Sequence, residues 1–223
     1  MTPATEPRIR HAPIPADALL VVRGDDLDPE TARAQALGFR RRFPDWQRWG
    51  LSAYYARSEA EIEDLAADQL ERFPVLVVLR IAELLAADFE VVPTFRTPHV
   101  TIAFQGDLDS ALAVLVTLGI DQRPNLYHDR EPNDEGGSVN DQPELDLIVD
   151  LNTMDDSGLP WAFISDAPHP ERVIPGAFVV AGSGAARAVA RVVDLVDGIV
   201  HVQPLRGSVA SNAALLTSRQ LAS

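Results

Sequence analysis

The sequence predicts an α+β domain followed by a small all-β, barrel-like domain. Up to residue 130, short apolar runs typical of buried strands alternate with capped, amphipathic segments typical of helices. After residue 143 the helical periodicity gives way to short strands separated by tight turns. The two patterns are separated by EPNDEGGSVNDQP, a segment rich in glycine, proline, asparagine and acids. Two domains of different architecture are therefore expected.

These patterns divide the 223 residues into five parts. Residues 1–17 are rich in proline and aperiodic, and we expect a flexible arm there. Residues 18–131 form the predicted α+β domain, and residues 132–143 form the linker. Residues 144–207 form the predicted barrel-like domain, and residues 208–223 form a tail.

The composition is that of a soluble globular protein and excludes several kinds of chemistry. Hydrophobic residues make up 46% of the chain and charged residues 23%. The chain has no cysteine and no lysine, which excludes disulfides, thiol catalysis and a lysine nucleophile. No apolar run has the length of a signal peptide core or a membrane span, so we expect a cytoplasmic protein. The net charge of -14 argues against nucleic acid as a partner.

Local signals place the first elements of the α+β domain. Residues 18–22, ALLVV, form an apolar run that predicts a buried strand, which opens into a turn at Arg23 and Gly24. Asp28 followed by Pro29 predicts a helix start, with the aspartate as N-cap and the proline in the first helical position.

An arginine-rich loop, a strand and a second helix come next. The loop carries Arg40–Arg42, and the strand is predicted at 50–55. Ser58 then caps a helix, and Glu61, three residues further on, completes the pattern of a capping box.

The remaining elements follow from the same signals. In the α+β domain we predict strands at 75–79, 89–92 and 99–104, a helical turn at 82–87, and a helix from the N-cap Asp107 to Gly119. In the second domain we predict strands at 145–151, 161–164, 177–181, 188–196 and 199–202, the last two joined by a hairpin turn at Asp197-Gly198.

Arg23 is the first candidate for binding a ligand. It follows a predicted buried strand, and Gly24 beside it lets a ligand approach the backbone. A guanidinium group binds a phosphate or a carboxylate through two parallel hydrogen bonds. The competing interpretation is a surface ion pair with Asp25 or Asp26.

Ser52 and Tyr54 are the next candidates. Alternate residues of a strand face the same side, so these two share one face, and Tyr55 shares the other with Ala53. A small hydroxyl beside an aromatic ring suits a planar ligand such as nicotinamide or a base. The competing interpretation is ordinary strand composition, since tyrosine is common in strands.

Three further residues could take part in catalysis. Glu63 has no capping role, and its carboxylate could stabilise a positively charged intermediate. His99 and His128 could act as general bases. The competing interpretations are an exposed helix glutamate and two polar loop histidines. The spacing of histidines and acids matches no metal-binding motif, so no metal is expected.

The first domain resembles the RES family of bacterial toxin domains, relatives of the ADP-ribosyltransferase fold. The residues that carry the resemblance are the first-strand Arg23, the pair Arg48-Trp49, the strand end Tyr55-Ala56, the helix acid Glu61 or Glu63, and the segment from Asn125 to His128. The resemblance implies a split, mixed sheet with flanking helices, and cleavage of the nicotinamide–ribose bond of NAD.

The resemblance also implies roles for single residues. Arg23 would hold a phosphate or ribose of NAD, Tyr54 or Tyr55 would stack on the nicotinamide, and Glu63 would stabilise the developing positive charge. Further contacts to NAD, as the substrate, would come from Gly24, Arg48, Ser52, Tyr55 and His128.

The leading hypothesis is therefore an NAD-cleaving or ADP-ribosyl-transferring, toxin-like protein. The alternative is a non-catalytic protein–protein interaction module of a toxin–antitoxin or immunity system, whose acidic surface suits a basic partner. A third hypothesis is a ribonuclease, with Arg40–Arg42 on phosphates and His99 or His128 as base. An antitoxin, inhibitor or target protein is the expected partner, and the second domain is itself a candidate inhibitor.

Overall fold

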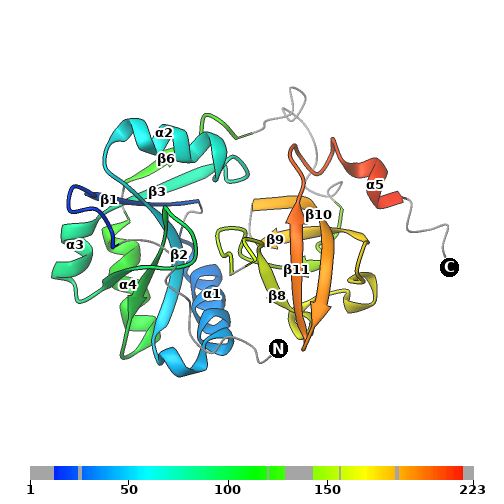
Figure 1. Ribbon diagram of the computed structural model, residues 1–223, viewed down its shortest axis with the longest axis horizontal. Coiled ribbons are helices and arrows are strands. Elements are labelled where there is room, and N and C mark those ends of the chain that lie inside the picture. Colours follow the sequence, from blue (N-terminus) through cyan, green and yellow to red (C-terminus); the bar gives the residue numbers. More distant parts are fainter. Residues whose placement is uncertain are drawn as a thin grey trace. The chain divides into compact units, whose positions relative to one another are not determined.

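The computed structural model describes most of the chain, namely residues 13–24, 27–119, 121–128, 143–155, 157–183 and 186–217. Two compact units are present (Figure 1). Unit 1 consists of Met1–Tyr127 and Asn152–Gly158, and unit 2 of His128–Leu151 and Leu159–Ser223. Most of the predicted linker lies outside the described residues. Among the residues that are described, no helix is both long and apolar enough to cross a membrane.

Unit 1 is built on a six-stranded sheet with the order β4-β5-β2-β1-β3-β6. Its strands are β1 (Leu20–Gly24), β2 (Trp49–Ala56), β3 (Val75–Arg80), β4 (Glu90–Pro93), β5 (His99–Phe104) and β6 (Gln122–Pro124). The predicted α+β class is confirmed. The five pairings are all antiparallel and join the strands into one sheet, whereas the family resemblance implies a split, mixed sheet.

The helices of unit 1 begin where the sequence predicts them. They are α1 (Pro29–Arg42), α2 (Glu59–Asp68), α3 (Ile81–Ala86) and α4 (Leu108–Leu118), with a 3-10 turn, η1 (Pro44–Trp46), after α1. Asp28 and Asp107 cap α1 and α4, each accepting a backbone N–H bond of 2.9 Å. Ser58 caps α2 at 3.4 Å, but the Glu61 carboxylate reaches back to the N–H of Arg57, not of Ser58.

One face of the sheet carries the main apolar core of unit 1. The buried residues Val21, Ala53, Val77 and Ile102 share this core with α1 and α4 residues such as Ala36 and Leu112. Strand alternation produces this arrangement, because every second side chain of β1, β2, β3 and β5 points to the same side. The side chains of Ser52 and Tyr54 point to the other face of the sheet.

Unit 2 is a five-stranded sheet with the order β7-β9-β10-β11-β8. Its elements are β7 (Leu147–Ile148), β8 (Trp161–Phe163), η3 (Ile164–Asp166), η4 (Pro170–Arg172), β9 (Phe178–Ser183), β10 (Ala186–Val196), β11 (Ile199–Pro204) and α5 (Ala213–Thr217). Edge strand β7 contacts η3, which directly follows the other edge strand, so the sheet is nearly closed as predicted. Asp197 and Gly198 have φ of 53° and 78°, which confirms the predicted hairpin turn.

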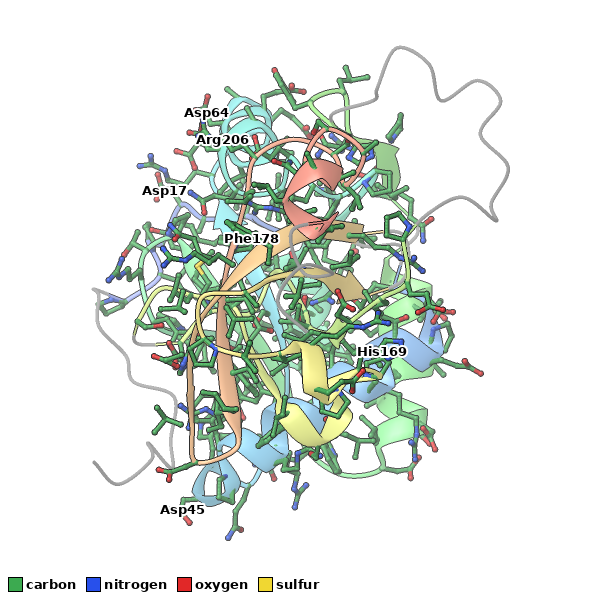
Figure 2. All side chains as sticks on the ribbon, turned by 90° about the vertical axis from the view of Figure 1, so that its right-hand side faces the viewer. Asp17, Asp45, Asp64, His169, Phe178 and Arg206 are labelled. Carbon is green, nitrogen blue, oxygen red and sulfur yellow. The ribbon has the colours of Figure 1, made fainter. Side chains whose placement is uncertain are left out.

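Acidic side chains lie on the surface of unit 1, as the net charge leads one to expect. Asp17, Asp45 and Asp64 are all exposed and are labelled among the side chains of Figure 2. Each lies on a different part of the unit: before β1, in η1 and on α2. The acidic groups are therefore spread over the surface.

Candidate functional site

Arg23 is completely buried at the end of β1. The pairing of β1 with β2 ends one residue earlier, at Val22 and Tyr54. The Arg23 guanidinium donates through Nη1 to the Ser52 carbonyl at 2.7 Å and through Nη2 to the Gln35 side-chain oxygen. These bonds fix the guanidinium next to β2, and they compensate part of the cost of burying a charge. The predicted alternative, a pair with Asp25 or Asp26, falls on residues outside those described.

Residues 152 and 153 pack against the end of β1 and the middle of β2 within unit 1. Asn152 is completely buried; its side-chain oxygen accepts from the Gly24 N–H at 3.3 Å, and its side-chain nitrogen donates to the Gly24 carbonyl at 2.9 Å. The Tyr54 hydroxyl donates to the Asn152 carbonyl at 3.5 Å. The hydroxyls of Thr153 and Ser52 are 3.0 Å apart. Thus one short segment contacts three of the predicted ligand-binding residues.

Asp155 continues this segment with a buried carboxylate. One oxygen accepts bonds from the backbone N–H and the hydroxyl of Ser157, at 2.7 and 2.5 Å. The other oxygen is 3.5 Å from Nη2 of Arg42, and both side chains are only 9% exposed. The ion pair links the segment to the last turn of α1.

His99 lies beside Tyr54 and is 2% exposed, not in a polar loop. The two rings meet edge to face, with centroids 5.5 Å apart. His99 Nδ1 is 2.9 Å from the Thr94 hydroxyl, which is 2.8 Å from the Thr101 hydroxyl. A titratable ring is therefore held in a defined orientation against a candidate binding residue.

We call this group the Arg23 cluster; its members are Arg23, Gly24, Gln35, Ser52, Tyr54, His99, Asn152 and Thr153. Four of the eight sequence-predicted site residues belong to it: Arg23, Gly24, Ser52 and Tyr54. The prediction that Ser52 and Tyr54 share a face is confirmed, since both bond to residues 152–153.

The other predicted site residues have different surroundings. Glu63 is exposed on α2, and its carboxylate bonds to the Tyr127 hydroxyl and raises the pKa of that tyrosine. Arg48 forms an ion pair of 3.2 Å with Glu90 on β4. His128 is half-buried and belongs to unit 2. None of the contacts described for these residues joins them to the Arg23 cluster.

The arginines of the predicted phosphate-binding loop point to separate partners. The Arg40 guanidinium lies 4.2 Å from the Trp49 ring centroid, a cation–π contact. The Arg42 guanidinium lies 5.1 Å from the Phe43 ring centroid and pairs with Asp155, whereas Arg41 is exposed. Because the three arginines have different surroundings, they do not form the common phosphate-binding site that the ribonuclease hypothesis requires.

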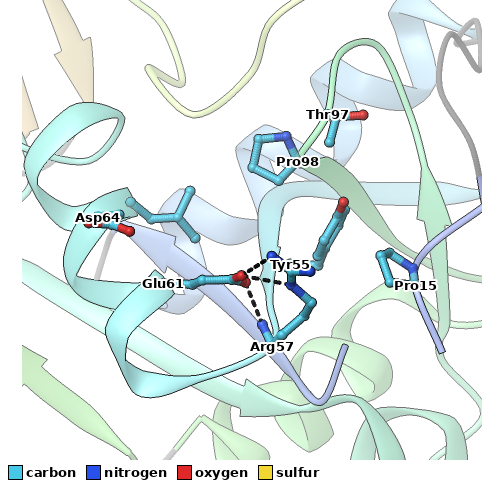
Figure 3. Close-up of a pocket in the computed structure, with 8 residues that line it drawn as sticks. Pro15, Tyr55, Arg57, Glu61, Asp64, Thr97 and Pro98 are labelled. Atoms are coloured by element: carbon cyan, nitrogen blue, oxygen red, sulfur yellow. Dashed lines mark hydrogen bonds and ion pairs between the residues drawn. The ribbon is translucent and has the colours of Figure 1, made fainter. Parts of the chain in front are cut away.

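Tyr55 lines an open pocket of about 330 Å³ at the end of β2 (Figure 3). Leu65 and Pro98 provide further apolar wall, and Arg57 and Glu61 lie at its polar side. Glu61 accepts from the Arg57 side chain at 2.6 Å and from its backbone N–H at 2.8 Å. The bond from the Arg57 side chain is the larger cause and the bond from the Arg57 backbone the smaller, and together they lower the pKa of Glu61 below its ordinary value of 4.5. The pocket and the Arg23 cluster share no residue.

The sequence did not identify Gln35, Asn152, Thr153 or Asp155 as site residues. Gln35 lies in a helical pattern, where a glutamine is ordinary. The other three belong to LNTMDDSG, which lies within the part of the chain assigned to the second domain. Nothing local in this segment indicates that it packs against β1 and β2.

Within the described ranges, no group of three or more His, Cys, Asp or Glu side chains is arranged to hold a metal ion. Comparisons with protein-family models, with curated proteins and with solved structures find no match for this chain.

Proposed function

We propose that unit 1 binds NAD and cleaves its nicotinamide–ribose bond at the Arg23 cluster. The observation that carries the proposal is the fully buried guanidinium of Arg23, which donates to the backbone carbonyl of Ser52 on the neighbouring strand. A buried charged group contributes little net stability, because desolvation offsets much of its attraction to partners. Such a group calls for a functional explanation, and binding an anionic ligand is one.

Arg23 supplies the contact to the anionic part of NAD in this proposal. A guanidinium presents its donors in a rigid fork that matches a phosphate, and its charge is retained at all physiological pH values. Hydrogen bonds to Gln35 and to the Ser52 carbonyl fix the orientation of the Arg23 guanidinium. The Arg23 side chain therefore loses little conformational entropy when a ligand binds. Ser52 itself provides a hydroxyl for the ribose.

Tyr54 and His99 would act at the nicotinamide end. The Tyr54 ring stacks on the nicotinamide, and the bond between the nicotinamide nitrogen and ribose C1′ breaks with its electron pair going to the nitrogen. The ribose becomes an oxocarbenium ion, which water attacks, and the products are nicotinamide, ADP-ribose and a proton. His99, in edge contact with Tyr54, would accept that proton. Glu63, which the family resemblance assigns to the oxocarbenium ion, bonds instead to Tyr127.

Nicotinamide release from millimolar NAD by the full chain tests the proposal, with Arg23→Lys as the informative variant. Lysine keeps the charge and loses the fork, so we expect kcat/KM to fall at least about tenfold. Arg33→Lys is the matched control, because Arg33 is 52% exposed and pairs only with Asp109 among the contacts described for it. An Arg23→Lys variant that releases nicotinamide as fast as the parent would contradict it.

A non-catalytic binding module is the second candidate. The observation that favours it is that polar groups of Gly24, Ser52 and Tyr54 already bond within the chain. Expression in a bacterial host separates the two candidates. An NAD-cleaving protein lowers cellular NAD and arrests growth in an Arg23-dependent way, whereas a binding module leaves NAD unchanged.

A further inference from the structure

Residues 152–155 take up the hydrogen-bonding groups that the proposed NAD site would offer to its ligand. Asn152 bonds to both backbone groups of Gly24, and its own carbonyl accepts from Tyr54. Thr153 lies within hydrogen-bond distance of the Ser52 hydroxyl. Each of these partners on β1 and β2 was predicted from the sequence to contact NAD. The segment therefore occupies the place of the ligand.

The segment resembles a polar ligand in its chemistry as well as in its position. It presents an amide, a carbonyl, a hydroxyl and a carboxylate, the last paired with Arg42. Asn152, Thr153 and Asp155 are 0%, 7% and 6% exposed, so the segment is enclosed and does not simply lie over the cluster.

We propose that residues 152–155 form a plug, an internal segment that fills the NAD site and has to leave it before NAD binds. This inference rests on the proposed function and adds its regulation. The parent chain is in the closed state described here, and the open state is a minor population. When only a fraction of the molecules is open, the apparent Kd for NAD rises by the reciprocal of that fraction.

The contacts that hold the plug are polar, so hydrogen bonds to a ligand can replace them. Asn152 and Thr153 attach it through polar groups, and three of the contacts are long: 3.3 Å to Gly24 and 3.5 Å each for Tyr54 and Arg42. A typical hydrogen bond adds little net stability, because water or a ligand can replace it. NAD offers replacement groups for most of these bonds, so exchange costs little.

The variant Asn152→Ala/Thr153→Ala tests the plug in the full chain. It removes the side-chain bonds to Gly24 and Ser52 and leaves the proposed NAD contacts intact. Loss of two to three bonds of ordinary strength predicts an apparent Kd for NAD lower by about tenfold or more, measured by calorimetric titration with NAD.

Asn125→Ala is the matched control for general loosening of unit 1. Asn125 is also a buried asparagine of this unit, donating to the Leu70 carbonyl at 2.8 Å and accepting from the Tyr127 N–H at 3.0 Å. It contacts no plug residue in the bonds described for it, so we expect a parent-like Kd. An equal gain in affinity from Asn125→Ala would overturn the plug.

A reversible lock provides a second test. The Ser52 and Thr153 hydroxyls are 3.0 Å apart, and the chain has no native cysteine, so Ser52→Cys/Thr153→Cys can form a single engineered disulfide. Ser52→Cys also removes the proposed ribose contact, so the comparison is made only between the two redox forms of this variant. We expect the oxidised form to bind NAD at least about tenfold more weakly than the reduced form, since the plug can no longer leave.

The outcomes separate the two proposals. Equal NAD affinity of parent and Asn152→Ala/Thr153→Ala, or of oxidised and reduced lock, overturns the plug and leaves the proposed function standing. No NAD binding by any of the folded variants overturns the proposed function, and with it the regulation that depends on it. Tighter binding on loss of the plug side chains together with oxidation-dependent closure supports both.

Discussion

Asn152 bonds to Gly24 in the way that one strand bonds to its neighbour, although 128 positions separate the two residues in the sequence. The Asn152 side chain accepts from the Gly24 N–H and donates to the Gly24 carbonyl. In this way the side chain satisfies both backbone groups of a buried residue at the point where the pairing of β1 with β2 has ended. A ligand entering the cluster has to replace both bonds.

Backbone strain at Gly158, three residues after the plug, should open the plug without removing any of its polar groups. Gly158 has φ of 77°, and a Cβ there would lie 2.9 Å from Nη1 of Arg96. Gly158→Ala therefore costs about 1–2 kcal/mol in the packed segment. We expect nicotinamide release at limiting NAD to rise severalfold.

Gly106→Ala is the control for that variant. Gly106 also lies in unit 1 and has φ of 84°, but a Cβ there would meet no atom within 4 Å. The backbone strain is similar and lies in the loop before α4. A similar fall in the melting temperature with no rise in nicotinamide release is expected, and a rise equal to that of Gly158→Ala would argue against the plug.

For glycines without a positive φ, the free space around the Cα atom should decide whether substitution by alanine stabilises or destabilises unit 1. Gly38 lies inside α1 and a Cβ there would meet nothing within 4 Å, so Gly38→Ala should stabilise unit 1 by about 0.5–1 kcal/mol through helix propensity. Gly50 lies in β2, and its Cβ would be 2.7 Å from the Phe39 ring, so Gly50→Ala should destabilise by about 1–3 kcal/mol through overpacking. Urea unfolding measures the change in the free energy of unfolding for each variant. Equal changes for Gly38→Ala and Gly50→Ala would contradict the packing described for β2.

The Arg57–Glu61 pair beside the open pocket predicts a pH-dependent stability. Because bonding to Arg57 lowers the pKa of Glu61 in the folded chain, its contribution is present above the ordinary value of 4.5 and is lost as the pH falls through the lowered pKa. Both side chains are partly exposed, so water screens the pair and its contribution is small.

A double-mutant cycle with Arg57→Gln and Glu61→Gln, followed by urea unfolding at several pH values, isolates this contribution. The coupling between the two residues should be constant above pH 5 and should decline as the pH is lowered below about 4.5. A coupling energy that grows as the pH is lowered would show that folding does not lower the pKa of Glu61.

Asp146 is the corresponding test of unit 2. Its side chain is completely buried, accepting from the Val180 N–H at 2.8 Å and from Nη1 of Arg172 at 3.0 Å. Asp146→Ala leaves a buried N–H without this acceptor and should destabilise unit 2 by about 3 kcal/mol. Asp194→Ala is the control: Asp194 bonds to His201 but is 48% exposed, so its removal should cost less than about 1 kcal/mol. Equal losses in thermal unfolding would contradict this difference.

Local signals account for what could be predicted of the fold. The N-caps Asp28, Ser58 and Asp107 depend on hydrogen bonds that span three residues, so the sequence alone locates the helix starts. The hairpin at Asp197-Gly198 is local in the same sense. Strand β6 escaped prediction, because three residues in a polar stretch carry no alternation.

The candidate site was predictable only as far as strand geometry determines it. Alternation along β2 placed Ser52 and Tyr54 on one face, and the pairing of β1 with β2 brought Arg23 next to the backbone carbonyl of Ser52. The bond of Glu63 to Tyr127 could not be predicted, because Tyr127 lies in a loop distant in the sequence. Asn152 and Thr153 escaped because their contacts depend on chain packing across about a hundred residues or more.

Nicotinamide release from NAD by the full chain carrying Asn152→Ala/Thr153→Ala, with and without Arg23→Lys, tests whether the Arg23 cluster cleaves NAD. Proton NMR follows free nicotinamide, and circular dichroism establishes that both chains are folded. We expect release by the first chain and a loss of at least about tenfold when Arg23→Lys is added. Folded chains that release no nicotinamide, or that release it equally with and without Arg23→Lys, would contradict the proposed function.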